Sequence, residues 1–142
     1  MAEEKTLDFI DIPDCSNTVE PHAVESGEYK LRVVGWGGGL NKSGKPYMMP
    51  KLAVVEPKVV GARIMTYYIA LPHAEMDENE LNKCLRKIKG FCGAFGLSYP
   101  MRVNTKEDVG METWALVEKK TADDPEYADD DGYTNEVKRW VR

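Results

Sequence analysis

The 142-residue chain has few of the side chains that catalysis and metal binding usually require. Its three cysteines are odd in number and form no C-x-x-C pair, which argues against a disulfide framework and against a zinc site. Neither of its two histidines has a serine, cysteine or carboxylate placed near it by the sequence, so no acid-base or nucleophilic set is indicated. We therefore expect a protein that is not an enzyme, holds no cofactor and no metal, and works in a reduced, cytosolic setting.

Long apolar runs are also missing. No stretch approaches the ~20 apolar residues that a membrane helix needs, so no membrane association is expected. The first residues are acidic and polar rather than basic and then apolar, which predicts that there is no signal peptide. The length suits one domain with a real hydrophobic core.

The net charge of −5 is unevenly divided along the chain. Residues 1–26 carry seven acids and one lysine, for −6, and residues 123–142 carry seven acids and three bases, for −4. Residues 27–122, the predicted folded body, carry ten acids and fifteen bases, for +5. A basic body with segregated acid is the charge pattern expected of a protein that binds a polyanion.

A glycine-rich stretch at residues 36–47 looks at first like a phosphate-binding loop. Gly39, Gly44 and Lys45 satisfy the first seven positions of G-x-x-x-x-G-K-[ST]. Pro46 then stands where a hydroxyl should hold Mg²⁺, and the segment after it reads as a strand rather than as the helix that such a loop requires. The pattern disfavours a phosphohydrolase and predicts a flexible, basic connection between two strands.

The order of the expected elements is strand, strand, strand, helix, strand, strand. Residues 1–26 read as an extended N-terminal arm, anchored through Phe9, Ile10 and Ile12. Asp77 with Glu80 forms a capping box that starts the helix. The expected strands cover residues 28–36, 47–56, 62–71, 111–120 and 133–142, the helix follows Asp77 as far as Gly96, and residues 123–132 form a mobile acidic loop.

This order is that of the oligonucleotide-binding (OB) fold, a five-stranded barrel whose helix lies between strands 3 and 4. We therefore expect an all-β dominated OB barrel at residues 27–142, preceded by the arm at 1–26. In that fold the ligand crosses the outer face of strands 2 and 3, between the loops joining strands 1 to 2 and 4 to 5. Here those loops are the glycine-rich stretch and the acidic loop.

Short segments along nearly the whole chain carry a family resemblance, namely residues 7–14, 27–34, 42–47, 71–72, 85–95, 110 and 135–140. In these segments the chain resembles bacteriophage-encoded single-stranded-DNA-binding proteins of the OB fold. The resemblance implies a non-enzymatic protein that binds single strands during phage DNA replication or recombination, in the cytoplasm of the infected bacterial host. The chain departs from the family in its acidic loop, which is longer and more acidic than the resemblance leads us to expect.

Single-strand binding needs cations along the phosphates and aromatic faces for the bases. Alternation along the strands places such residues outward or beside the glycine-rich stretch. The candidate DNA-binding residues are Lys30, Arg32, Trp36, Lys42, Lys45, Tyr47, Lys51, Tyr68, Lys138 and Trp140.

One of these candidates has a second interpretation. Trp36 could instead plug the end of the barrel, whereas Trp114 is expected in the core. In the last strand, Val137 and Val141 are expected to face one way and Trp140 the other.

The expected partners are single-stranded DNA, with RNA also open because a stacking groove does not depend on the sugar. Phage or host replication and recombination proteins and further copies of the chain are also open. An alternative function is a protein-interaction or assembly module, in which the barrel is a scaffold and the acidic loop contacts the partner.

Overall fold

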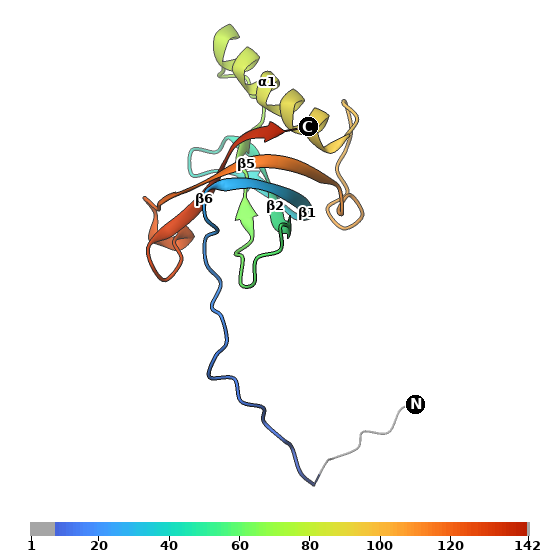
Figure 1. Cartoon of the computed structure of the whole chain (residues 1–142). Helices are drawn as coiled ribbons and strands as arrows, with labels where there is room; N and C mark the ends of the chain where they lie inside the picture. Colours follow the sequence, from blue (N-terminus) through green and yellow to red (C-terminus); the bar gives the residue numbers. More distant parts are fainter. Residues whose placement is uncertain (1–7, 142) are drawn as a thin grey trace.

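The computed structural model describes residues 8–141 and is mostly β, with one antiparallel sheet and one α-helix in the described part of the chain (Figure 1). The first strand begins at Gly27, the residue at which the sequence predicts that regular structure begins. The elements are β1 (Gly27–Leu40), β2 (Pro46–Glu56), β3 (Met65–Thr66), β4 (Ile69–Ala70), α1 (Glu78–Phe95), β5 (Glu112–Thr121), the 3₁₀ turn η1 (Pro125–Tyr127) and β6 (Tyr133–Val141). No helix in residues 8–141 is long and apolar enough to cross a membrane.

The sheet is open rather than a closed barrel. Its strand order is β3-β2-β1-β5-β6, and β4 also pairs with β2. Over the part of the chain that is described, no ladder joins the β3 and β4 edge to β6. Side chains approach each other across this gap instead, because the rings of Tyr67 and Trp140 lie with their centroids 5.0 Å apart.

The hairpin of β1 and β2 is longer and more regular than the sequence suggested. β1 continues through the glycines to Leu40, so the expected flexible connection shrinks to a turn closed by the Asn41 carboxamide oxygen, which accepts from the backbone N–H of Ser43 and of Lys45. Gly38 permits this pairing, because a Cβ there would lie 3.0 Å from the carbonyl oxygen of Tyr47. The glycines therefore bring two strands together, and a strand follows them rather than the helix of a phosphate-binding loop.

The single strand expected at 62–71 is reduced to the two short strands β3 and β4. Pro50 of β2 explains the break, since proline has no backbone N–H to return to the ladder. Its carbonyl oxygen still accepts from the N–H of Tyr67 at 3.0 Å, which keeps the connecting residues beside β2.

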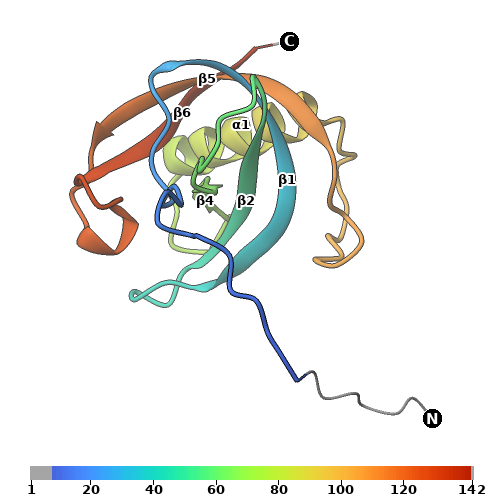
Figure 2. The same cartoon turned by 60° about the horizontal axis from the view of Figure 1, so that its bottom comes forward.

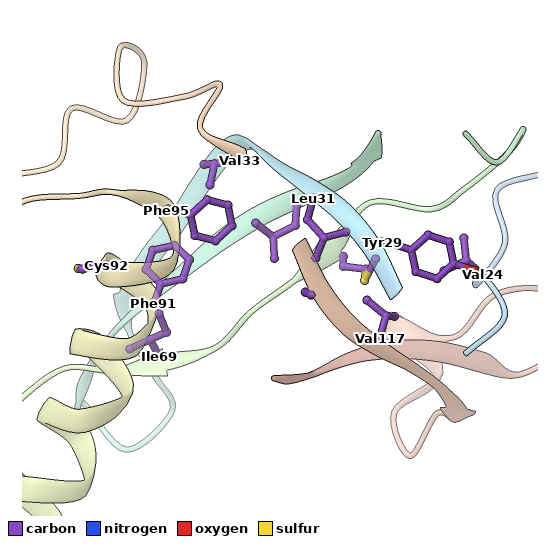
Figure 3. Close-up of a cluster of buried hydrophobic side chains, with 12 residues drawn as sticks. Val24, Tyr29, Leu31, Val33, Ile69, Phe91, Cys92, Phe95 and Val117 are labelled. Carbon is purple, nitrogen blue, oxygen red and sulfur yellow. The ribbon is translucent and has the colours of Figure 1, made fainter. Parts of the chain in front are cut away.

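Helix α1 is confirmed where the capping box predicts it. The Asp77 carboxylate accepts from the N–H of Glu80 at 2.8 Å, and Gly96 ends the helix with a left-handed φ of 70°. The helix buries Phe91 and Phe95 against the sheet, where they meet Leu31 and the other inward side chains of the strands (Figure 3). This packing forms the core.

The N-terminal arm is anchored by other residues than expected. Phe9, Ile10 and Ile12 are almost fully exposed on a segment that leaves the body in both views (Figures 1 and 2). The anchor is His22 with the two residues after it: His22 exchanges backbone hydrogen bonds of 2.9 Å with Gly61 and with Arg63. Backbone pairing and two buried residues, Ala23 and Val24, hold the root of the arm in place of the predicted apolar triplet.

The acidic loop has a definite conformation, contrary to the mobile loop predicted from its composition. The Asp129 carboxylate accepts from the N–H of Ala23, Asp131 and Tyr133 at 2.8–3.0 Å. These hydrogen bonds lower the pKa of Asp129, those from Ala23 and Tyr133 most. The loop is organised by its own carboxylate rather than by apolar burial.

Candidate nucleic-acid interface

A groove of about 510 Å³ lies on the outer face of β2, β3 and β4, beside the turn of the β1–β2 hairpin. It is apolar and aromatic with one cation, and none of the residues that line it is acidic. The lining residues are Leu40, Asn41, Lys42, Tyr47, Met49, Thr66, Tyr68 and Tyr127.

Two stacked tyrosines form the centre of the groove. The rings of Tyr47 and Tyr68 lie with centroids 5.2 Å apart and planes 21° from parallel. Alternation explains their position: the neighbours Met48 and Ile69 pair across β2 and β4 and turn toward the core, so Tyr47 and Tyr68 turn outward. Tyr68 keeps 43% of its surface exposed, which leaves an aromatic face open to a ligand.

Two lysines supply positive charge to this face. Lys42 lines the groove at the hairpin turn, and Lys51 lies outward on β2, opposite Thr66 of the groove. Both are exposed, and neither makes an ion pair with any residue between 8 and 141. Cations without a carboxylate partner are available to neutralise phosphates.

Tyr127 completes the groove and was not predicted. It belongs to η1 of the acidic loop, and its carbonyl oxygen accepts a 3.0 Å hydrogen bond from the Arg63 guanidinium. Arg63 therefore ties the acidic loop to the segment that precedes β3. The sequence feature that could have predicted Tyr127 as a groove residue is its aromatic side chain, which lies in a stretch whose acidic composition predicts a solvated loop.

A second hollow, of about 620 Å³, occupies the open edge between β3 and β6 and shares Thr66, Tyr68 and Tyr127 with the groove. Its charge is mixed, since Arg63, Lys87, Lys120, Asp123, Asp124, Glu126 and Glu136 all line it.

Within this hollow, the Lys87 ammonium lies 4.7 Å from the ring centroid of Tyr67. Burial lowers the pKa of Lys87, and the nearby Glu136 carboxylate partly opposes that effect. Burial also raises the pKa of Tyr67. The hollow continues the groove around the edge of the sheet, but it is less favourable to phosphate than the groove because carboxylates line it.

Some predicted cations are on the outer surface but already paired. The Lys30 ammonium lies 3.5 Å from the Glu112 carboxylate. The Nε of Arg32 donates a hydrogen bond of 2.6 Å to the same carboxylate. These contacts, chiefly the hydrogen bond from Arg32, lower the pKa of Glu112. Lys45 lies 3.9 Å from Glu75, and Lys138 lies 3.2 Å from Glu118.

The tryptophans are placed differently from the prediction. Trp36 packs edge-on against Phe91, with centroids 5.9 Å apart, and its indole N–H donates to the carbonyl of Asp108 at 2.6 Å. It packs against the core rather than facing outward, so it agrees better with its second interpretation, a plug, than with an exposed stacking residue.

Trp140 also packs on the core, with its ring centroid 5.2 Å from that of Phe95. The prediction that it faces away from Val137 is wrong, because the ladder of β5 and β6 shifts register between Leu116 and Val117. Trp114 also departs from its prediction. It is only half-buried between the buried Thr113 and Ala115, so it turns away from the core.

Of the ten predicted residues, the structure brings Lys42, Tyr47 and Tyr68 together in the groove, with Lys51 beside them. Between residues 8 and 141, no group of three histidine, cysteine, aspartate or glutamate side chains is placed to hold a metal ion.

No curated protein is similar enough to match the chain. One family model matches residues 13–136, which is most of the chain and includes the whole groove. The chain therefore belongs to the family described as proteins of unknown function, DUF669.

Proposed function

We propose that this protein is a non-enzymatic binder of single-stranded DNA, which coats exposed strands without reading their sequence during phage DNA replication or recombination. One observation carries the proposal: the stacked pair of Tyr47 and Tyr68 lies in a groove with Lys42 and no acidic lining residue. Aromatic faces and unpaired cations are the two components that sequence-tolerant single-strand binding requires.

In this proposal the phosphates follow the cations and the bases meet the rings. Lys42 and Lys51 neutralise the backbone, while exposed faces of Tyr68 and Tyr127 stack on bases. Stacking of this kind contributes ~1–3 kcal/mol per base, and every base has a π-face. The groove therefore binds strands of any sequence, and it accepts RNA as well as DNA because stacking does not depend on the sugar.

We infer that the fold is an OB barrel whose closing edge is held by side chains. The antiparallel order β3-β2-β1-β5-β6 and the position of α1 before β5 support this. The groove lies on the face of the second and third strands, between the first hairpin turn and the acidic loop, where the OB fold binds its ligands.

The position of the acidic loop favours single-strand binding over the alternative function, a scaffold that recruits a protein partner. Its Tyr127 lines the groove, and Arg63 fixes the carbonyl of that residue. Changing Asp123→Asn, Asp124→Asn and Glu126→Gln together leaves Asp129 and these contacts in place. Tighter DNA binding by this variant supports a loop that borders the groove, whereas capture of a protein partner by a wild-type chain with no DNA affinity supports the scaffold.

One titration tests the proposed function. Fluorescein-labelled oligo-dT, a duplex and an RNA oligomer are titrated with protein at two salt concentrations. The proposal predicts preference for single strands over duplex and an affinity for oligo-dT that falls steeply as salt rises. Equal binding of single strands and duplex at low salt would contradict it.

A further inference from the structure

We propose that the N-terminal arm of one copy docks on the flank of α1 in a second copy, which links the chains head to tail. In the arm, residues 8–14 consist of three aspartates, three large apolar residues and one proline, and contain no base. Phe9, Ile10 and Ile12 are 87%, 78% and 84% exposed within four residues. Exposure of these apolar side chains to water is unfavourable in free energy, because burial of apolar surface is stabilising.

Helix α1 offers an apolar strip of matching size. Leu81 and Leu85 are 37% and 47% exposed, and Lys89 continues their row at the same four-residue interval. The side of the helix that packs on the core carries Cys84 and Phe91 instead. The flank of Leu81, Leu85 and Lys89 is therefore open to solvent.

The spacing of the two surfaces agrees. Residues four apart on a helix rise about 6 Å along its axis, and residues two apart on an extended chain lie about 6.6 Å apart. The side chains of Ile10 and Ile12 can thus rest on Leu81 and Leu85 together. This leaves an aspartate at the end of the arm segment for Lys89.

Charge selects this part of the helix and this occupant. From Leu81 to Phe95, α1 carries four basic residues and no acidic one, whereas the arm segment carries three aspartates. Glu78 and Glu80 in the first turn repel the arm and so confine it to the flank from Leu81 onward.

The geometry of the chain favours a second copy over its own helix. In Figure 1 the arm leaves the body on the side away from α1, and its root is fixed by the hydrogen bonds of His22. An arm on one side and its receptor on the other form a heterologous contact, which joins copies into a ring or an open chain. The contact leaves the groove free, so on the proposed function it would favour neighbouring positions on one DNA strand.

The docking is tested on protein without DNA. A failure of the docking proposal can therefore be distinguished from a failure of the proposed function. Cys15 is exposed at the end of the arm segment, while Cys84 and Cys92 are buried, so a benzophenone maleimide labels the arm selectively. Equal amounts of ¹⁴N and ¹⁵N protein are mixed, irradiated and analysed by mass spectrometry. We expect mixed-isotope cross-links from the arm to residues 81–89. Cross-links to α1 within one isotope only, cross-links to the groove, or none above a denatured control would overturn the proposal.

Sedimentation velocity over a range of protein concentrations supplies a second readout. Lys89→Glu should weaken association about tenfold, because it replaces an attraction with a repulsion. Adding Asp14→Lys should restore it, because Asp14 is the arm residue that the register places beside Lys89. Lys83→Glu is the matched control, since Lys83 lies two residues after Leu81 and so on the opposite side of the helix, and this variant should associate like wild type. Equal association by the Lys89 and Lys83 variants would overturn the proposal.

Discussion

Changing Tyr68 to alanine removes one of the two stacked rings of the groove and leaves the core intact. The ring is 43% exposed and contacts Tyr47 at a centroid distance of 5.2 Å. Loss of that pair costs about 0.5–1.5 kcal/mol of folding stability. If the open face of Tyr68 stacks on one base, its loss costs ~1–3 kcal/mol of binding, which weakens oligo-dT affinity about 5- to 150-fold.

Fluorescence anisotropy with labelled oligo-dT measures this change, and urea unfolding shows that the variant is folded. Tyr133→Ala is the matched control, because Tyr133 is 38% exposed at the start of β6 and lines neither the groove nor the second hollow. Its affinity should stay within twofold of wild type. An unchanged affinity for the Tyr68 variant, or an equal loss for both variants, would refute a stacking role.

Three further variants test the phosphate contacts, the core and the acidic loop. Lys42→Gln and Lys51→Gln should each reduce the slope of log affinity against log salt by about 0.7, measured by anisotropy at four salt concentrations; an unchanged slope would exclude phosphate contacts at these lysines. Phe91→Ala should cost ~3–5 kcal/mol in urea unfolding, since Phe91 is fully buried among four other aromatic rings; a loss below about 1 kcal/mol would contradict its central place in the core. The lowered pKa of Asp129 implies a stabilisation of the fold that is complete above the ordinary aspartate pKa near ~3.9 and is lost as pH falls through the lowered value. Asp129→Asn should therefore reduce the melting temperature at pH 7 and narrow the difference in melting temperature between pH 7 and acid. An equal reduction at both pH values would oppose this.

Local sequence patterns predicted the strand faces and the helix start, because these features depend on residues close together in the chain. The alternation of Tyr29, Leu31 and Val33 gives the inward face of β1, and the capping residue Asp77 marks the start of α1. The outward positions of Tyr47 and Tyr68 also follow from alternation, and these residues form the centre of the groove.

The sequence could not predict features that depend on pairing between distant segments. A register shift in the ladder of β5 and β6 turns Trp140 toward the core, and alternation in one strand cannot reveal a bulge. Arg63 reaches the backbone of Glu126 and Tyr127, more than sixty residues away, and so orders a loop whose composition indicates mobility.

The most direct test of the central claim is a map of the residues that change when a single strand binds. In ¹H–¹⁵N correlation spectra of ¹⁵N protein, a short oligo-dT should shift the backbone signals of residues 40–49, 66–68 and 127, and a duplex of the same length should shift them much less. Single-strand shifts that leave these segments unchanged and gather elsewhere on the chain would contradict the assignment of the groove.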